Sequence, residues 1–454
     1  MNRIRLFILT LPLMLIACSS TGGKDTIARL RHVQIEIKEE KIEGGIDKAM
    51  AGYQRFLKDT SDSALTPEAI RRLADLKIEK EYGTFTPGSD PAEKRPARAL
   101  PAPQSTTHPK NALVANAPPD RVLAHVSVQN ESEADFERRA TRSQSIPGTA
   151  AAADRPAESA DDLERADTRE AIALYKKLLD KYPLYDRNDQ VLYQMSRAYA
   201  ELGQIEKSMV VMNRLIREFP RSRYIDEVQF RRAEYFFTRR RYLDAEDAYK
   251  SIVKIGVASP FYELALYKLG WTFYKQELYE AALDPFIALL DYKVSKGYDF
   301  AQTKDEQERK RTEDTFRVIS LSFSNLGGAN SVVEYFSRHG KRSYEDDIYS
   351  NLGEFYFDKR RYADASATYN AFVSRNPFHK KAPGFQMRVI EIQSAAGFPS
   401  LVLDAKKKFA ETYALNAEYW KYFDPKDRPD VLGYLKTNLT DLANYYHACY
   451  QDPK

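Results

Sequence analysis

The sequence has few of the residues that support redox, metal or disulfide chemistry. Its 454 residues include only two cysteines, Cys18 and Cys449, with two tryptophans and six histidines. The histidines are scattered without the spacing of metal ligands, and no CxxC pair occurs. No GxxxxGK[ST], HExxH, GxSxG or GxGxxG segment is present either. We therefore expect no metal, no cofactor and no enzymatic activity.

A strong excess of one charge is also missing. Lys and Arg number 69 against 65 Asp and Glu, which gives a net charge of +4. So small an excess gives no reason to expect a nucleic acid partner. Hydrophobic residues make up 43% of the chain, which is enough for one large core or for an elongated row of small ones. After Ala17, no apolar run is long enough to cross a membrane.

The segment 1–17 has the pattern of a signal peptide. Arg3 and Arg5 precede an apolar run from Leu6 to Ile16, which is too short for a stable membrane anchor. The run ends in Leu-Ile-Ala and then Cys18, which resembles the lipobox of bacterial lipoproteins. That resemblance implies cleavage before Cys18 and acylation of its thiol and of the new amine. The alternative is an ordinary signal peptide followed by a chance cysteine.

The residue after Cys18 bears on location. By resemblance to sorting rules in Gram-negative cells, Ser19 favours the outer membrane, where Asp would favour retention at the inner one. We therefore expect a lipid-anchored protein of the cell envelope that faces the periplasm. Several acyl chains would hold it firmly, because each buried methylene contributes about 0.8 kcal/mol.

Small and ring-bearing residues recur at a fixed interval along the chain. One series is Ser196, Ala233 and Gly270, followed three positions later by Tyr199, Phe236 and Phe273. The other is Ala171, Ser208, Ala245 and Ala282, followed four positions later by Tyr175, Met212, Tyr249 and Phe286. A small residue lets two antiparallel helices approach closely, and the larger residue fills the space beside it. Such helix pairs bury their apolar faces only by stacking, so the interval predicts an all-α solenoid.

The repeated unit resembles the tetratricopeptide (TPR) family. One copy runs through Leu266, Leu269, Gly270, Phe273, Ala282 and Phe286, and another through Tyr349, Leu352, Gly353, Tyr356, Ala365, Tyr369 and Pro377. These follow the family pattern W-x2-L-G-x2-Y and A-x3-F, with Leu266 in place of Trp. The resemblance covers about two thirds of the chain and implies an α-α superhelix that holds other proteins. The step from Ala245 to Ala282 exceeds the family's period of about 34, which implies longer links between units.

The same spacing reaches the N-terminal part of the chain. The step from Ala245 on a second helix to Gly270 on the next first helix equals the step from Ala49 to Ala74. We therefore predict that a first helix at 66–81 packs against a second helix at 168–182. The alternative is a separate N-terminal helical hairpin on a tether.

This prediction makes residues 84–165 an insertion within one repeat. The segment holds 10 of the 22 prolines, with much Ala, Ser, Thr and charge. Such a composition is typical of disorder. It leaves room for one short helix around 131–141.

In the TPR family, partners bind the concave face, which the first helices line just after their packing residues. Carrying those positions over to this chain gives Tyr193 and Arg197, then Phe230, Glu234 and Phe237, then Tyr267, Trp271 and Tyr274. The resemblance implies that these side chains grip an extended peptide or a helix of a partner protein. The alternative is that a tight superhelix buries these rings against its own neighbours.

Two basic turns lie at equivalent positions of different repeats. They consist of Arg239, Arg240 and Arg241, and of Lys359, Arg360 and Arg361. The plain interpretation is a solvated turn between paired helices. The alternative is a basic ridge that meets an acidic partner or lipid headgroups.

The expected organisation follows from these patterns. We expect a signal peptide (1–17), a lipidated N-terminus with the first TPR-like helices (18–83), a disordered insertion (84–165), regular repeats (166–291), a charged insertion (292–312) and further repeats (313–454). The last repeat is incomplete, because Leu439, Leu442, Ala443 and Tyr446 read as a first helix without a second.

A lipobox joined to TPR repeats suggests a scaffold. In architecture the chain resembles BamD-like outer-membrane assembly lipoproteins and the pilot lipoproteins of secretins, which implies a membrane-anchored adaptor for partner proteins. One alternative is an envelope organiser that links the outer membrane to peptidoglycan or division proteins. Another is the non-catalytic part of an enzyme whose catalytic domain lies beyond residue 454.

Overall fold

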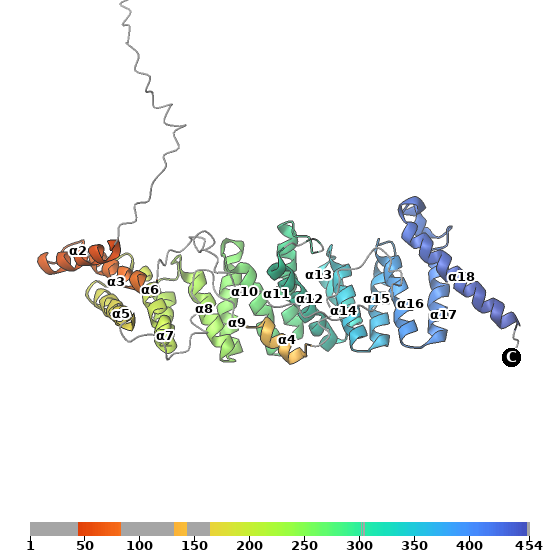
Figure 1. Ribbon diagram of the computed structural model, residues 1–454, viewed down its shortest axis with the longest axis horizontal. Helices are drawn as coiled ribbons and strands as arrows, with labels where there is room; N and C mark the ends of the chain where they lie inside the picture. Colours follow the sequence, from red (N-terminus) through yellow and green to blue (C-terminus); the bar gives the residue numbers. More distant parts are fainter. Residues whose placement is uncertain (1–43, 83–130, 143–163, 301, 303–304, 452–454) are drawn as a thin grey trace, which may run out of the picture.

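The computed structural model describes residues 44–82, 131–142, 164–300, 302 and 305–451. Within these ranges the chain forms helices and no strand. Apart from α4, the helices follow one another along an elongated array from α2 to α18 (Figure 1). This confirms the all-α superhelix that the repeat interval predicts. The signal peptide and Cys18 lie outside the described residues.

Most helices have about the same length, as a repeat requires. Their bounds are α2 Gly45–Asp59, α3 Thr66–Tyr82, α4 Glu133–Ala140, α5 Glu164–Lys181, α6 Asn188–Glu201, α7 Ile205–Glu218, α8 Ile225–Thr238, α9 Tyr242–Ile255, α10 Tyr262–Lys275, α11 Tyr279–Ser295, α12 Glu306–Leu326, α13 Ala329–His339, α14 Glu345–Asp358, α15 Tyr362–Arg375, α16 Ala382–Ala395, α17 Pro399–Thr412 and α18 Pro429–Gln451. The predicted charged insertion at 292–312 is shorter than expected, because α11 continues to Ser295 and α12 begins at Glu306.

Successive helices form pairs, which we call first and second helices. The first helices are α3, α6, α8, α10, α12, α14 and α16, and the second helices are α5, α7, α9, α11, α13, α15 and α17. The small residues of the period lie where the two approach. A Cβ added at Gly270 would stand 2.6 Å from the Phe286 ring, and one at Gly353 would stand 2.5 Å from the Tyr369 ring. Glycine therefore permits the close approach of paired helices.

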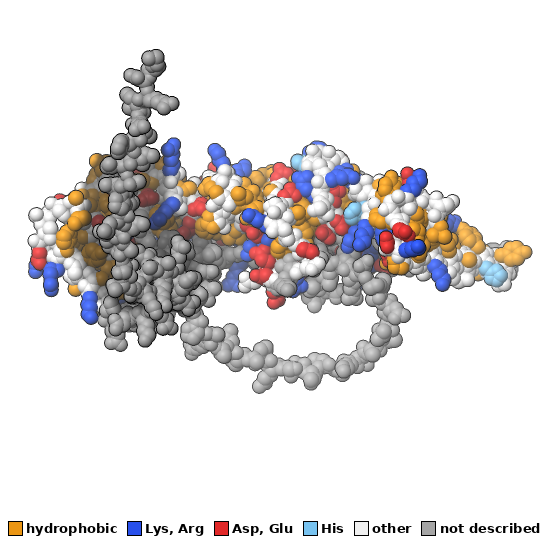
Figure 2. Space-filling view, turned by 90° about the horizontal axis from the view of Figure 1, so that it is seen from above, with side chains coloured by type: hydrophobic (Ala, Val, Ile, Leu, Met, Phe, Trp, Pro, Cys, Tyr) orange, Lys and Arg blue, Asp and Glu red, His pale blue; other side chains and the backbone are white. Residues whose placement is uncertain are grey.

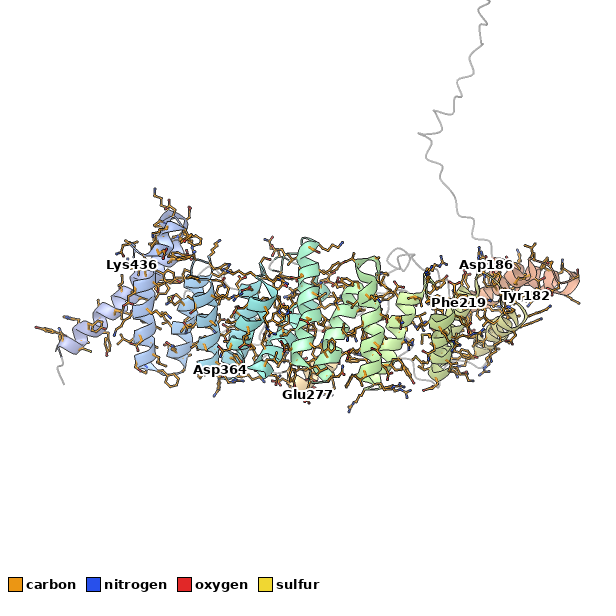
Figure 3. All side chains as sticks on the ribbon, turned by 180° about the vertical axis from the view of Figure 1, so that it is seen from behind. Tyr182, Asp186, Phe219, Glu277, Asp364 and Lys436 are labelled. Carbon is orange, nitrogen blue, oxygen red and sulfur yellow. The ribbon has the colours of Figure 1, made fainter. Side chains whose placement is uncertain are left out.

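The turns within pairs lie along one edge of the array, and the turns between pairs lie along the opposite edge. Figure 3 shows Glu277 and Asp364 at the first edge and Tyr182 and Phe219 at the second. Within the pairs, one turn residue adopts a positive φ at equivalent positions: Gly203, Arg240, Glu277, Arg360 and Gly397. Each of these first helices therefore ends in a left-handed residue that reverses the chain.

The contact between α3 and α5 that the sequence spacing predicts is present. The Tyr175 hydroxyl donates a 2.6 Å hydrogen bond to Asp75. The same tyrosine-to-acid bond joins Tyr369 to Glu354 at 2.6 Å within the α14–α15 pair. The sequence separation is 15 residues in that pair and 100 residues between α3 and α5. The two helices therefore form a repeat interrupted by a long inserted segment.

Buried apolar residues form one continuous core from Ile70 on α3 to Ile392 on α16. A second, smaller cluster around Phe409, Tyr419 and Val431 joins α16, α17 and α18. The end of α18 is only partly covered, because Leu439 and Tyr446 are about half exposed. Figure 2 shows hydrophobic side chains gathered at this tip of the molecule. Where the sequence predicts the first helix of an incomplete repeat, the structure has the second half of α18.

Candidate functional site

The most informative feature of the structure is α4, a helix inside the long inserted segment. Ser132 caps its N-terminus by accepting a 3.1 Å hydrogen bond from the Asp135 backbone amide. Glu133 and Asp135 lie in its first turn, and Arg138 and Arg139 lie in its last. Acidic residues near the positive N-terminal end of the helix dipole and basic residues near its negative C-terminal end stabilise the helix. It forms where the sequence leaves room for a short helix within a segment predicted to be disordered.

α4 lies across the first helices of three successive repeats. Its contacts come from Tyr267, Lys268, Trp271 and Lys275 of α10, Asp314 and Arg317 of α12, and Lys359 after α14. We call this set of residues the docking face. In Figure 1, α4 stands in front of the neighbouring helices in this part of the array. The inserted segment thus returns to a surface that lies far along the chain, since Lys268 and Thr141 are separated by 127 positions.

Phe136 is the apolar anchor of α4. Its side chain is 0% exposed, although most of the residues around it on α4 face solvent. The ring packs 5.5 Å from the Trp271 ring, measured between centroids. The Arg317 guanidinium also lies over the Phe136 ring, 4.0 Å from the ring centroid. An aromatic ring in contact with an indole and a guanidinium gains both apolar burial and cation–π attraction.

A network of charged groups surrounds this anchor. Arg139 makes a two-pronged contact with Asp314, with nitrogen–oxygen distances of 2.8 and 3.0 Å. It also contacts Glu131 at 2.8 Å, and Glu131 in turn pairs with Arg317 at 2.9 Å. The hydrogen bond from Arg139 lowers the pKa of Glu131. Two cations and two carboxylates therefore alternate across the contact of Glu131 and α4 with α12, so that each charge faces an opposite one.

The C-terminal end of α4 is capped by α10. The Lys268 ammonium donates to the backbone carbonyls of Thr141 at 3.0 Å and Arg142 at 3.3 Å, and it contacts Glu234 at 3.2 Å. The Tyr267 hydroxyl donates to the Ala140 carbonyl at 3.2 Å. A cation at this position complements the negative end of the helix dipole. Because it recognises backbone atoms, this contact requires a helix end rather than a particular side chain.

Two lysines at the edge of the docking face hold acidic residues of α4. Lys275 forms an ion pair with Glu137, and Lys359 forms one with Glu133 at 2.6 Å. The two glutamates are one helical turn apart, so they present their charge on one side of α4. The side chains of Lys359 and Glu133 are about half exposed, and such pairs contribute little to stability. They orient α4 more than they anchor it.

Of the predicted partner-binding residues on α10, Tyr267 and Trp271 lie in the docking face and Tyr274 lies beside it. Tyr267 and Trp271 are fully buried, and α4 supplies part of the cover. Burial raises the pKa of Tyr274, and nearby Glu137 of α4 adds to the effect. Tyr274 also packs edge-on against Trp271 at 5.4 Å. These rings therefore belong both to the repeat core and to the surface that receives α4.

The predicted residues of the two preceding repeats make contacts inside the array. Phe230 packs against Tyr249 and Phe261 and is 0% exposed. Tyr193 stacks on Tyr224 at 4.1 Å and donates a hydrogen bond to Glu227. Both rings are buried against groups of the same or the next repeat.

The other three predicted positions have mixed surroundings. Arg197 donates to the Tyr193 hydroxyl at 3.1 Å. Glu234 accepts a hydrogen bond from Tyr249 and pairs with Lys268. Phe237 packs edge-on against Tyr242 at 5.6 Å and lies below the Lys268 ammonium. Glu234 and Phe237 therefore stand next to the docking face and support the lysine that caps α4.

The basic turns serve the repeat fold. Arg240 and Arg360 are the left-handed residues of their turns. The flanking cations pair within the chain: Arg239 with Glu206, Arg241 with Asp244, Arg361 with Asp364 and Lys359 with Glu133. Lys359 is the member of these turns that belongs to the docking face.

Neither Asp314 nor Arg317 is among the residues that the repeat pattern selects for partner binding. Both lie on α12, which belongs to neither of the two copies of the family pattern quoted from the sequence, so the pattern gives no reason to favour them. Two local signals do point to α4. The Ser-x-x-Asp sequence from Ser132 to Asp135 is a helix-capping pattern, and Phe136 is one of two aromatic residues in the segment 84–165.

The described residues show neither a metal-binding cluster nor a helix that could span a membrane. No group of three or more His, Cys, Asp and Glu side chains there is placed to hold a metal ion. No helix in those same ranges combines the length and the apolar character needed to cross a membrane. Cys449 is a free thiol exposed on α18.

Sequence profiles of known repeats match three parts of the chain. Sequence profiles of the tetratricopeptide repeat match residues 162–228, 230–293 and 346–379. A tetratricopeptide repeat protein of Parabacteroides merdae, known from a crystal structure, is 14% identical, and the match covers 61% of this chain and 94% of that one, with a TM-score of 0.29. No curated protein matches the sequence. The helix pairs at the matched positions are tetratricopeptide repeats, a module that generally binds protein or peptide partners.

Proposed function

We propose that this chain is a non-catalytic adaptor that holds a helix of a partner protein on its docking face. The docking of α4 carries the proposal. The buried ring of Phe136, the ion pair between Arg139 and Asp314, and the hydrogen bond from Lys268 to the C-terminal end hold a short helix there. These are the elements by which helices are recognised in grooves of other proteins. A face that accommodates such a helix from its own chain has the chemistry to accommodate one from a partner.

We propose further that acyl chains on Cys18 anchor the adaptor to a membrane of the bacterial envelope. The support is the charged start at Arg3 and Arg5, the apolar run and the lipobox-like residues before Cys18. Ser19 favours the outer membrane, with the repeats in the periplasm. By resemblance in architecture, the partner would belong to the assembly of outer-membrane proteins or of a secretion machine.

The anchor is tested by labelling. Cells that express the chain are fed an alkyne analogue of palmitate, and the Cys18→Ser variant is compared with the wild type. We expect the label and membrane association to be lost together in the variant. Labelling that persists in Cys18→Ser, or a wild-type chain without label, contradicts the anchor.

Partner capture is tested separately by crosslinking in envelope membranes, followed by purification and mass spectrometry. Asp314→Arg should abolish capture, because it removes the buried acid of the docking face. Arg217→Glu is the matched control, since Arg217 is 73% exposed on α7, outside the docking face. Capture of peptidoglycan-binding or division proteins would favour an envelope organiser. Equal recovery of every partner with Asp314→Arg would contradict the proposal.

A further inference from the structure

α4 is held by few buried groups. It has eight residues, and a helix of that length is barely stable by itself in water. Phe136 and Ala140 are its only buried residues. Its position therefore depends on the docking face rather than on its own helical tendency, and loss of a few contacts would release it.

Besides the hydrogen bonds from Tyr267 and Lys268 to its last carbonyls, the contacts of α4 include ion pairs that are partly open to solvent. In the Arg139–Asp314 pair the arginine side chain is 32% exposed, and in the Arg317–Glu131 pair the arginine is 27% exposed. Salt and water weaken pairs of this kind. Contacts that combine one buried ring with screened charges suit an exchangeable ligand better than a permanent part of the core.

Three residues in and beside α4 are recognised by side chains of the docking face. Arg317 contacts Glu131, Trp271 and Arg317 enclose Phe136, and Asp314 binds Arg139. Their spacing is Glu-x4-Phe-x2-Arg, which places Phe136 and Arg139 on one side of the helix. The docking face therefore specifies its ligand by one carboxylate, one ring and one guanidinium at fixed separations.

We propose that α4 is an intramolecular ligand that occupies the docking face, and that a partner helix with the pattern Glu-x4-Phe-x2-Arg displaces it. This inference rests on the proposed function, and it names both the chemistry of the partner helix and the regulation of the same face. Because α4 belongs to the same chain, it competes at a high effective concentration. A partner helix must overcome this competition. The docking face is therefore closed to partners while α4 is bound to it.

Exchange is tested with a fluorescent peptide of residues 129–143 and the purified full chain in detergent. Its affinity is measured by anisotropy for the wild type and for the variant Phe136→Ala with Arg139→Ala. The double variant releases its own α4 and leaves the docking face intact. We expect the peptide to bind it at least about tenfold more tightly than the wild type.

Arg138 supplies a matched control for this release. It neighbours Arg139 on α4, yet its side chain is 78% exposed and its ion pair is with Asp135 of the same helix. Peptide affinity for Arg138→Ala should equal that for the wild type. Tight binding to this variant would mean that any change in α4 opens the face, which contradicts the specific role of Phe136 and Arg139.

A charge exchange tests where the peptide binds without relying on loss of function. Asp314→Arg is added to the double variant, and its helical content is checked by circular dichroism. The wild-type peptide should then bind at least about tenfold more weakly, and a peptide with Arg139→Asp should bind more tightly than the wild-type peptide. Failure of this rescue in a folded chain overturns the assignment of the peptide to the docking face.

Other outcomes also overturn the proposal. Equal affinity of the peptide for the wild type and the double variant means that α4 does not compete. A wild-type dimer that becomes a monomer in the double variant, seen by light scattering, means that α4 of a second copy occupies the face. If partner capture in the crosslinking experiment depends on Asp314 but the peptide never exchanges with α4, only this inference is refuted. Peptide exchange without any captured partner refutes only the proposed function.

Discussion

Single glycines set the distance between paired helices. Gly270 and Gly353 stand inside helices, where glycine ordinarily lowers stability by about 0.5–1 kcal/mol relative to alanine. Both lie against a buried ring, Phe286 or Tyr369, that leaves no room for a Cβ. Steric contact therefore outweighs helix propensity at these two positions. The sequence pattern predicts this role, because a small residue and a ring recur together.

We predict that Gly270→Ala lowers the free energy of unfolding by about 1–2 kcal/mol, because the overpacking penalty exceeds the gain in helix propensity. The change is measured as a lower midpoint of urea denaturation. Gly433→Ala in α18 is the control, since nothing lies within 4 Å of its added Cβ. That variant should be unchanged or more stable by about 0.5–1 kcal/mol. A stabilised Gly270→Ala variant would contradict the close-approach argument.

Arginine in the left-handed region is a second feature at this scale. Arg240 has φ 58° and Arg360 has φ 59°, whereas the equivalent turns at residues 203 and 397 use glycine. A side chain in this region costs about 1–2 kcal/mol. Glycine removes that cost from the folded state. It also gives the unfolded chain more conformational freedom, which offsets part of the gain in stability.

We therefore predict that Arg240→Gly raises the free energy of unfolding by about 0.5 kcal/mol. The adjacent Arg239→Gly is the control and should destabilise the protein. Arg239 has φ −86° and pairs with Glu206, so glycine there gains nothing and loses an ion pair. Thermal melting of the two variants beside the wild type checks the prediction. The same direction of change in both variants would refute it.

At the scale of one element, α14 carries an acidic N-terminal turn. Asp347 takes the position on α14 that Asp314, the partner of Arg139, takes on α12. Burial raises the pKa of Asp347 to about 7, and Asp346 and Asp299 reinforce the effect against Lys381. A raised folded-state pKa means that the folded protein prefers the protonated acid. Stability is therefore lost as the pH rises from about 4 to about 7.

We predict that Asp347→Asn stabilises the protein at pH 8, by about 1–2 kcal/mol once solvent screening of the partly exposed side chain is allowed for. The gain should shrink as the pH falls toward 5, where the native acid is already protonated in the folded state. Urea denaturation at pH 5, 6.5 and 8 measures this slope. A gain that is equal at all three pH values would mean that the amide acts through packing and not through charge.

The place where α4 binds could not be predicted from the sequence. The capping residue Ser132 and the charge order of α4 are local features, and they favour a short helix. Its binding site depends on Asp314 and Arg317, which are separated from Arg139 and Glu131 by 175 and 186 positions of the chain. The repeat interval does not relate the residues in and beside α4 to those of α12. The sequence therefore leaves room for a short helix and selects the rings of α10, but it does not predict their contact.

At the scale of the whole molecule, the repeat interval predicts the architecture because each helix pair contacts only its neighbours. The position of α3 against α5 follows from the same spacing, since the geometry of a pair does not depend on the length of the chain that joins it. The local contacts of Phe230 and Tyr193 could not be predicted in this way. Whether a ring faces a groove or a neighbouring repeat depends on the curvature of the array.

The α3–α5 contact also predicts how the molecule behaves when the inserted segment is cut. Beyond the bond from Tyr175 to Asp75, Lys77 bridges α3 to α5 through Asp167 at 2.9 Å and Glu170 at 2.8 Å. The side chain of Lys77 is 5% exposed. Ile70 and Ala74 join the same continuous core as Ala171 and Tyr175. These contacts should hold α2 and α3 in place without a covalent link to α5.

We therefore predict that a protease site introduced between residues 100 and 110 yields, after cleavage, two fragments that coelute in size-exclusion chromatography. A matched variant that carries Tyr175→Ala and Lys77→Ala should release the N-terminal fragment, because it removes the buried Tyr175 ring with its bond to Asp75 and the bridge from Lys77 to α5. Separate elution of the fragments from the otherwise wild-type chain would favour a tethered hairpin over an interrupted repeat. Coelution of the fragments of the double variant would place the main contact elsewhere on α3.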